Sequence, residues 1–223
     1  MNRALVSRLI LKDWYLARTP LALIAAAGCA SVGVLYLRSE ASGFVGLTAA
    51  FIVTIFLGIL LPMLTIVNER KRQNLAFVMS LPISPMEYTT AKILSNVLAF
   101  IPIWLAIVAG VLWTIATAGS YGGIIPVTLV LALSPFVAFC LLLAVAIVLE
   151  SELIAMITMG AFNVSYSFYW FFLVRIPGLQ EEMKSPVAIW SRPILSIMAA
   201  EIAVIIVALG LTFFFQSRKR DFV

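Results

Sequence analysis

Six long apolar runs constrain this chain more than any other feature of its sequence. Each run is close to the about 20 residues that a helix needs to cross a ~30 Å hydrocarbon core. Backbone groups find no water partners in lipid, so each run should form a helix rather than an open strand. We therefore expect an all-α polytopic membrane protein, built as a single transmembrane domain over residues 1–223. The expected spans are Leu21–Leu37, Phe44–Val67, Ala91–Ala116, Ile124–Leu149, Leu153–Val174 and Ile194–Phe215.

The composition supports this class. Only 11% of the residues are charged, whereas a soluble domain carries about 25%. The mean hydropathy is +1.12. Both cysteines, Cys29 and Cys140, lie inside expected spans and need not pair.

Lysine and arginine are distributed unequally between the two sides of the predicted bundle. The N-terminal segment holds four of them, the connection between spans two and three holds four, and the C-terminal tail holds three. These 11 of the 15 fall on one side, which the positive-inside rule identifies as the cytoplasm. The N-terminus, this connection and the C-terminus are therefore predicted to be cytoplasmic, and the net charge of +5 needs no nucleic-acid partner.

Several kinds of catalytic site are missing from the sequence. The chain has no histidine, which removes a common metal ligand and general base. No lysine stands in a GxxxxGK phosphate-binding loop, and no GxSxG nucleophile elbow occurs. We therefore predict no catalytic residue, no metal site and no bound cofactor, so energy-driven work would need a partner protein or an ion gradient.

The segment 1–19 is basic and carries Trp14 and Tyr15, residue types that favour the lipid headgroup layer. We interpret it as a helix lying along the cytoplasmic leaflet and ending near Pro20. The alternative is a cytoplasmic extension of the first span.

The connection from Glu69 to Lys92 contains a helix-start signal. Ser84, Pro85 and Glu87 fit a capping box, with serine at the N-cap, proline at the first helical position and glutamate at the third. The third helix is therefore predicted to begin at Pro85, before the membrane.

The first half of this connection is predicted to be a short amphipathic helix. Leu75, Val78 and Met79 share one helical face, and Leu81-Pro82 ends the segment. A cytoplasmic apolar face between two membrane helices suits a contact with another protein. The alternative is a helix resting on the lipid surface, held by basic residues Arg70 to Arg72.

A sequence pattern in this connection resembles the ABC-2 type family of ATP-binding-cassette transporter permeases. The pattern is Glu69-Arg70, then Leu75, then Ser80-Leu81-Pro82-Ile83-Ser84, and finally Ala91-Lys92. Asn74 stands where threonine is common in the family. The resemblance extends to the six spans, the basic N-terminal helix and the longer external connection before the last span.

The resemblance implies a transport role in the cytoplasmic (inner) membrane of a prokaryote. Two permease copies, identical or related, would pair and recruit two separate ATPase subunits, which would bind ATP and Mg. Export of an amphipathic, lipid-like, peptide or drug substrate by alternating access would be the usual direction. The residues that would form the ATPase-coupling helix are Glu69, Arg70, Leu75, Phe77, Val78, Met79, Pro82 and Ser84.

Polar residues within the last two spans are candidates for the substrate pathway. Asn163, Tyr166, Ser167 and Trp170 share one face of the fifth span. They would line a substrate route or the dimer seam, although such residues more often make hydrogen bonds between helices. Glu201 lies about two turns into the last span, where an ionisable residue is a functional candidate. It would pair with Arg192 or Arg175, gate the pathway or carry a proton, unless it lies at the interface.

The external connection from Arg175 to Pro193 contains Pro177, Gly178 and Pro186. In the family such a segment folds back into the outer leaflet as short helices, and the alternative is a solvated loop.

Two other classes of function remain open. One is a gradient-driven secondary carrier that uses Glu201, although such carriers often show internal repeats, and none is evident here. The other is a non-transporting membrane assembly or immunity protein. An ATPase gene beside this one would favour the permease.

The orientation gives a test by cysteine labelling in a background without the native cysteines. A cysteine replacing Gln180 should react with an impermeant reagent outside intact cells, and one replacing Gln73 should not. The opposite pattern would overturn the predicted orientation and the cytoplasmic coupling role.

Overall fold

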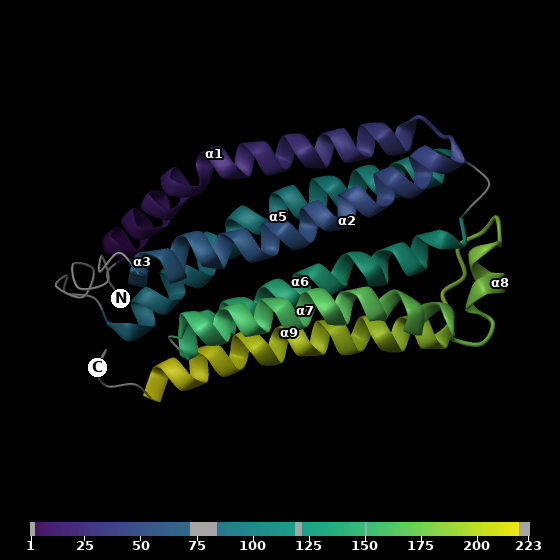
Figure 1. Ribbon diagram of the computed structural model, residues 1–223. Helices are drawn as coiled ribbons and strands as arrows, with labels where there is room; N and C mark the ends of the chain where they lie inside the picture. Colours follow the sequence, from purple (N-terminus) through teal and green to yellow (C-terminus); the bar gives the residue numbers. More distant parts are fainter. Residues whose placement is uncertain (1–2, 72–83, 119–121, 150, 219–223) are drawn as a thin grey trace.

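The computed structural model describes residues 3–71, 84–118, 122–149 and 151–218, and all regular secondary structure in these ranges is helical. Six of the helices are long and apolar enough to span a membrane. They lie side by side as an elongated bundle (Figure 1). The elements are α1 (Arg3–Tyr36), α2 (Glu40–Pro62), the π-helix η1 (Met63–Val67), α3 (Asn68–Lys71), α5 (Pro85–Ala118), α6 (Ile124–Val148), α7 (Glu152–Val174), α8 (Leu179–Met183) and α9 (Arg192–Arg218).

The helices form two connected groups. In one group α1 packs on α2 and α5, and in the other α6 packs on α7 and α9. The groups meet mainly where α2 packs on α6, with smaller contacts from α5 to α6 and α9. The expected six-helix membrane architecture is confirmed to this extent.

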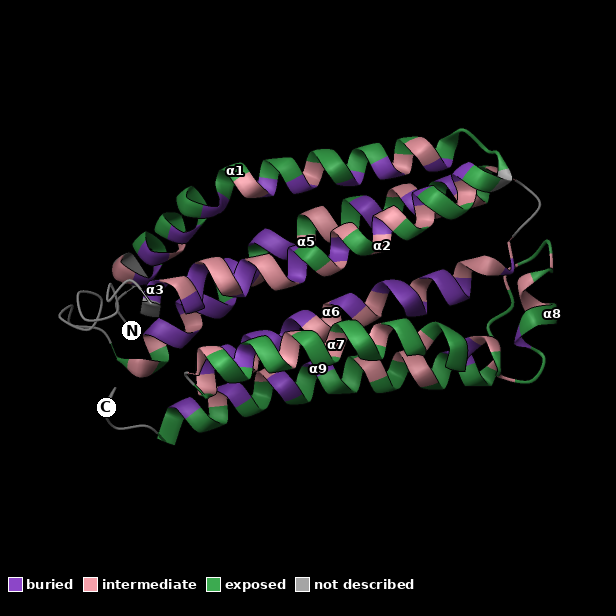
Figure 2. Ribbon diagram, viewed as in Figure 1, coloured by how far each residue is buried: buried purple, intermediate pink, exposed green. Residues whose placement is uncertain are grey.

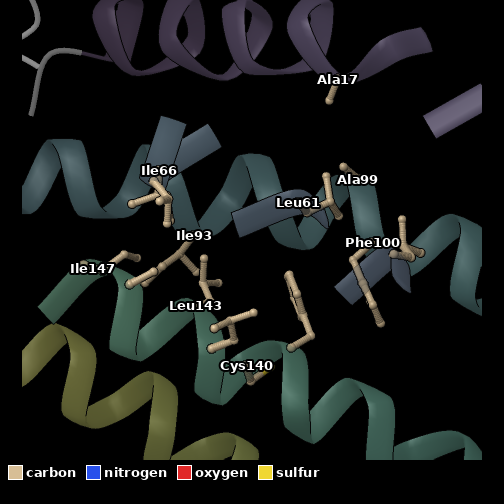
Figure 3. Packing of buried hydrophobic residues seen from close by; sticks show 14 of the residues in the cluster. Ala17, Leu61, Ile66, Ile93, Ala99, Phe100, Cys140, Leu143 and Ile147 are labelled. Carbon is tan, nitrogen blue, oxygen red and sulfur yellow. The ribbon is translucent and has the colours of Figure 1, made fainter. Parts of the chain in front are cut away.

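The largest apolar core lies where these groups meet. Phe100 of α5 stacks on Phe139 of α6 with ring centroids 4.4 Å apart, and both are buried. Figure 3 shows Ile66, Ile93 and Leu143 of this core between the helices of the two groups. The outward faces instead expose large apolar side chains, especially on α7 and α9 (Figure 2). Apolar residues on both the inner and outer surfaces of a helix suit a lipid surrounding.

The prediction that the N-terminal helix ends near Pro20 is wrong. Helix α1 continues through Pro20 to Tyr36, so the segment 3–19 extends the first span. Proline removes one backbone hydrogen bond and tends to kink a helix rather than end it within a packed bundle. Figure 1 shows that α1 changes direction along its length. Val6 and Leu9 pack against Tyr88 and Ala91 of α5, which holds the N-terminal part of α1 in place.

The predicted start of the third span at Pro85 is confirmed. Helix α5 begins at this residue. The Ser84 amide donates to Glu87 Oε2 at 3.0 Å, and the Glu87 amide donates to Ser84 Oγ at 3.2 Å. Both bonds of the capping box are therefore formed.

The connection between α7 and α9 contains a short helix, α8. Gly178, with a φ of 81°, precedes α8 in a left-handed conformation that glycine adopts without strain. Leu179 is buried in a cluster with Val127 and Ile194. The Gly123 amide donates to Ser185 O at 2.9 Å, so this connection packs on the start of α6. The expected short helix is present, and its depth in the membrane stays a prediction.

The start of α1, the end of α9 and the start of α5 lie at one end of the bundle, and α8 lies at the other (Figure 1). Because the first and last spanning helices begin and end at the same end of the bundle, the arrangement agrees with an even number of membrane crossings. Which end faces the cytoplasm stays the prediction made from the lysine and arginine distribution.

The close approach of α1 and α2 gives a stability test. A Cβ on Gly46 would lie 2.6 Å from the Leu35 amide nitrogen, whereas one on Gly43 would meet nothing within 4 Å. We expect Gly46→Ala to cost about 1–3 kcal/mol through overpacking. Gly43→Ala should be neutral or stabilising by up to about 1 kcal/mol, since alanine favours helix. Thermal unfolding of the purified variants measures both, and equal stabilities would contradict this packing.

Candidate functional site

A π-helical turn joins the end of α2 to α3. The Asn68 amide donates to Met63 O, five residues earlier, so the ordinary i to i+4 pattern is interrupted. Such turns occur frequently at functional sites. In this turn the Thr65 carbonyl oxygen accepts a hydrogen bond from Lys92 Nζ of α5 at 2.8 Å. The irregular turn therefore lies directly against a charged side chain.

Lys92 is fully buried, at 0% exposed. Besides Thr65 O, its ammonium group contacts Asp13 Oδ1 and Oδ2 of α1 at 3.0 and 2.9 Å. It also forms an ion pair with Glu69 of α3. An ammonium group has three protons to donate, and here it faces three acceptor groups. This one side chain thus connects α1, the π-turn with α3, and α5.

Glu69 has a second cationic partner. Lys12 Nζ donates to Glu69 Oε1 at 2.5 Å, with Lys12 about half exposed and Glu69 buried. Burial acts to raise the pKa of the Glu69 carboxyl, but the Lys92 and Lys12 ammonium groups outweigh it and hold that pKa below its ordinary value. Glu69 is therefore ionised at neutral pH, and the two lysines balance the two carboxylates.

Polar neutral groups complete this cluster. Ser95 Oγ donates to Asp13 Oδ2 at 3.1 Å. Asn96 Nδ2 donates to Lys92 O at 2.8 Å, and Asn96 Oδ1 lies 3.0 Å from Thr65 Oγ1. We call this set the Lys92 network, which comprises Lys12, Asp13, Thr65, Glu69, Lys92, Ser95 and Asn96.

The Lys92 network lies at the base of the connection between α3 and α5. Glu69 stands before this connection, Lys92 follows it within the first turns of α5, and the two side chains form an ion pair. Both are residues of the sequence pattern described above. The ion pair fixes the distance between the two ends of the connection.

The predicted coupling residues fall partly outside the described part of the chain. Ser84 is exposed and caps α5. Arg70 lies in α3, and its side chain is outside the described residues, as are Leu75, Phe77, Val78, Met79 and Pro82. The amphipathic helix predicted for 70–80 is therefore described only at Arg70 and Lys71. Glu69 has its partners within the chain, and its contact with an ATPase stays a prediction.

Two residues of the polar face of α7, Asn163 and Ser167, bond the main chain of their own helix. Asn163 Nδ2 donates to Met159 O at 3.0 Å, and Ser167 Oγ donates to Asn163 O at 3.1 Å. Both bonds lie within α7, and both residues are exposed. Among the described residues these two side chains make no hydrogen bond to another helix, whereas Tyr166 of the same face forms a hydrogen bond with Ser134 of α6. The interpretation of this face therefore stays a prediction. Trp170 is 42% exposed, whereas Tyr166 turns inward, 6.3 Å from the Phe51 ring of α2.

Glu201 has a tyrosine partner rather than an arginine. Tyr169 Oη of α7 donates to Glu201 Oε1 of α9 at 2.9 Å. Within the described ranges no ion pair joins Glu201 to Arg192 or Arg175. Glu201 Oε2 is buried and has no hydrogen-bond partner there. Tyr169 thus joins the substrate-pathway candidates, and Glu201 stays one.

Sequence reasoning missed five residues of the Lys92 network: Lys12, Asp13, Thr65, Ser95 and Asn96. One signal was available, since Asp13 is the only acidic residue before Glu40. A lone carboxylate in a basic segment invites a search for a buried cation. Residues 13 and 92 are 79 positions apart, and no local spacing connects them.

No group of three or more His, Cys, Asp or Glu residues in the described ranges is placed to hold a metal ion. Comparisons of the chain with protein-family models, curated proteins and solved structures gave no match.

Removal of the central positive charge should leave the Lys92 network with a strong imbalance of charge. Lys92→Met leaves the carboxylates of Asp13 and Glu69 with Lys12 as their one charged partner, and we expect a loss of about 3–5 kcal/mol of stability. Adding Asp13→Asn restores charge balance and should recover part of this loss. Lys12→Met, at a half-exposed position, should cost at most about 1 kcal/mol. Unfolding of these three variants and of Asp13→Asn alone in detergent measures these values, and additive losses in the double variant would argue against coupling.

Proposed function

We propose that this chain is the permease subunit of an ATP-binding-cassette transporter of the ABC-2 type. It pairs with a second permease copy and takes its energy from two separate ATPase subunits that bind ATP and Mg. The transported molecule is amphipathic, and the direction is export.

The observation that carries the proposal is the ion pair between Glu69 and Lys92. These residues stand at opposite ends of the sequence pattern that resembles the permease coupling loop. A coupling loop transmits force only if its base is fixed to the membrane helices. The Lys92 network supplies such a base, because Asp13 ties Lys92 to α1 and Lys12 ties Glu69 to α1.

Burial makes this base resistant to being pulled apart. Removing one partner of a buried ion pair leaves an uncompensated charge at a cost of about 3–5 kcal/mol. A push on the connection between α3 and α5 would therefore move α1, the end of α2 and α5 together. Rigid-body movement of packed helices is one established way of switching between inward-open and outward-open states.

The second group of helices suits a pathway that changes during transport. Helix α7 packs mainly on α6 and is largely exposed. The Tyr169–Glu201 hydrogen bond joins α7 to α9. Weakly packed elements open at lower cost than core elements. Movement of the weakly packed α7 against α6 and α9 would reshape the space beside Glu201.

A second candidate function is a gradient-driven secondary carrier with Glu201 as its proton site. The observation that favours it is the buried Glu201 Oε2, which has no hydrogen-bond partner among the described residues. The Lys92 network has no evident role in such a carrier, and we therefore prefer the permease.

A pull-down tests the permease. We expect the double variant Leu75→Asp, Val78→Asp to lose an ATPase encoded beside this chain, because burying two unpaired carboxylates costs several kcal/mol. A matched control, Leu37→Asp with Val187→Asp, places the same charges on exposed residues of the α1–α2 and α8–α9 connections. These connections lie at the other end of the bundle from the start of α5 (Figure 1). The control should retain the ATPase.

Membrane insertion of both variants is checked in parallel. Full retention of the ATPase by the first variant, with full stimulation of ATP turnover, would refute the coupling role and leave the connection as a membrane-surface anchor.

A further inference from the structure

A groove of about 350 Å³ lies between α6, α7 and α9. Its walls are mostly apolar and include Ser134 of α6, Tyr166 and Tyr169 of α7, and Ala200, Glu201 and Val204 of α9. We call it the α9 groove. Its volume lies within the range of about 300–1,000 Å³ that is usual for sites binding small organic molecules.

The single acidic group of the α9 groove is deep along its helix. Glu201 is nine residues from Arg192, where α9 begins. At a rise of 1.5 Å per residue this is about 14 Å along the axis. A carboxylate at such a depth is costly in a membrane and is normally paired. Tyr169 supplies one hydrogen bond to Oε1, and Oε2 has none from the described residues.

The missing partner of this carboxylate defines the chemistry of a ligand. A cation placed in the groove would offset the charge of Glu201 in surroundings where water does not screen it. The tyrosine rings of Tyr166 and Tyr169 line the same groove and attract cations through their faces. An apolar body would cover the remaining walls. A neutral ligand would leave the carboxylate unpaired, and an anion would be repelled.

We propose that the α9 groove binds a monovalent lipophilic cation, with Glu201 facing the positive charge and the apolar walls covering the body of the molecule. The inference rests on the proposed function in one respect, since it names such cations as the substrate class of the permease. Binding itself requires this chain alone.

A lipid chain could also fill an apolar groove, but it would leave the carboxylate without a partner. Charge distinguishes a lipophilic cation from a lipid chain as the occupant of the groove. Tetraphenylphosphonium and tetraphenylborate have nearly the same shape and opposite charges. Comparing them shows which sign of charge the groove prefers, because the shape of the ligand stays the same.

The experiment measures equilibrium binding of radiolabelled tetraphenylphosphonium to the purified full chain in nanodiscs of phosphatidylcholine, which has no net charge. Tetraphenylborate is measured in separate samples. We expect saturable binding of the cation and none of the anion. Glu201→Gln should weaken cation binding about tenfold or more, equivalent to about 1.4 kcal/mol or more. Glu181→Gln removes one negative charge from the exposed face of α8 and should leave the affinity unchanged.

A second variant keeps the carboxylate and fills the space. Ala200→Trp places a large side chain in the α9 groove and should abolish cation binding. Thermal unfolding is measured for each variant. If Glu201→Gln does not fold, Ala200→Trp and the comparison of the two ions decide the result.

Three outcomes would overturn the proposal. These are unchanged affinity in a folded Glu201→Gln variant, equal binding of both ions, and absence of saturable cation binding to the native chain. The last outcome would leave the groove to lipid or to a neighbouring helix. No ATPase is present in this assay, so its failure is distinct from failure of ATPase recruitment in the pull-down.

Discussion

The buried ammonium group of Lys92 is the interaction on which the first half of the structure depends. A fully buried lysine is tolerated only where its charge and its donors are matched. The match comes from a carboxylate on α1, a main-chain oxygen in the π-turn and a carboxylate on α3. These elements are thereby held at one point, together with α5, which carries the lysine. The π-turn brings the Thr65 carbonyl oxygen to this group, and the part of α1 before Pro20 brings Asp13.

Both groups of helices have apolar packing, and they differ in the polar contacts added to it. Polar contacts fix α1, α3 and α5 to one another, and they are directional. Helices α7 and α9 rest on α6 mainly through apolar contacts. The Tyr169–Glu201 bond joins α7 to α9, and Gln216 Nε2 of α9 donates to Ile147 O of α6 at 3.0 Å. Sliding two apolar helix surfaces past each other costs less free energy than separating the partners of a buried ion pair. A rigid group beside a more adaptable one is the arrangement that a hinge or rocking movement requires.

Sequence reasoning succeeded where local rules decide the structure. Run length located the six spans, and the spacing of Ser84 and Glu87 located the start of α5. It failed at Pro20, because tertiary contacts of Val6 and Leu9 stabilise a helix that local propensity would end. For Asn163 and Ser167 local spacing could not decide the partner, since a polar side chain in a helix can bond its own main chain as readily as a neighbour's. The Asp13–Lys92 pair was beyond its reach, because a contact across 79 residues depends on the packing of α1 on α5.

The charged groups also differ in how completely they are balanced. In the Lys92 network two lysines face two carboxylates, and neutral polar groups bond to the carboxylate of Asp13 and the main chain of Lys92. Such a site is complete within the chain and has a structural role. Glu201 has one tyrosine hydroxyl and no cation among the described residues, although it lies beside a groove with room for a small molecule. An incomplete site of this kind is stable only when a ligand, a proton or a partner completes it, and the groove's volume and tyrosine rings favour a ligand.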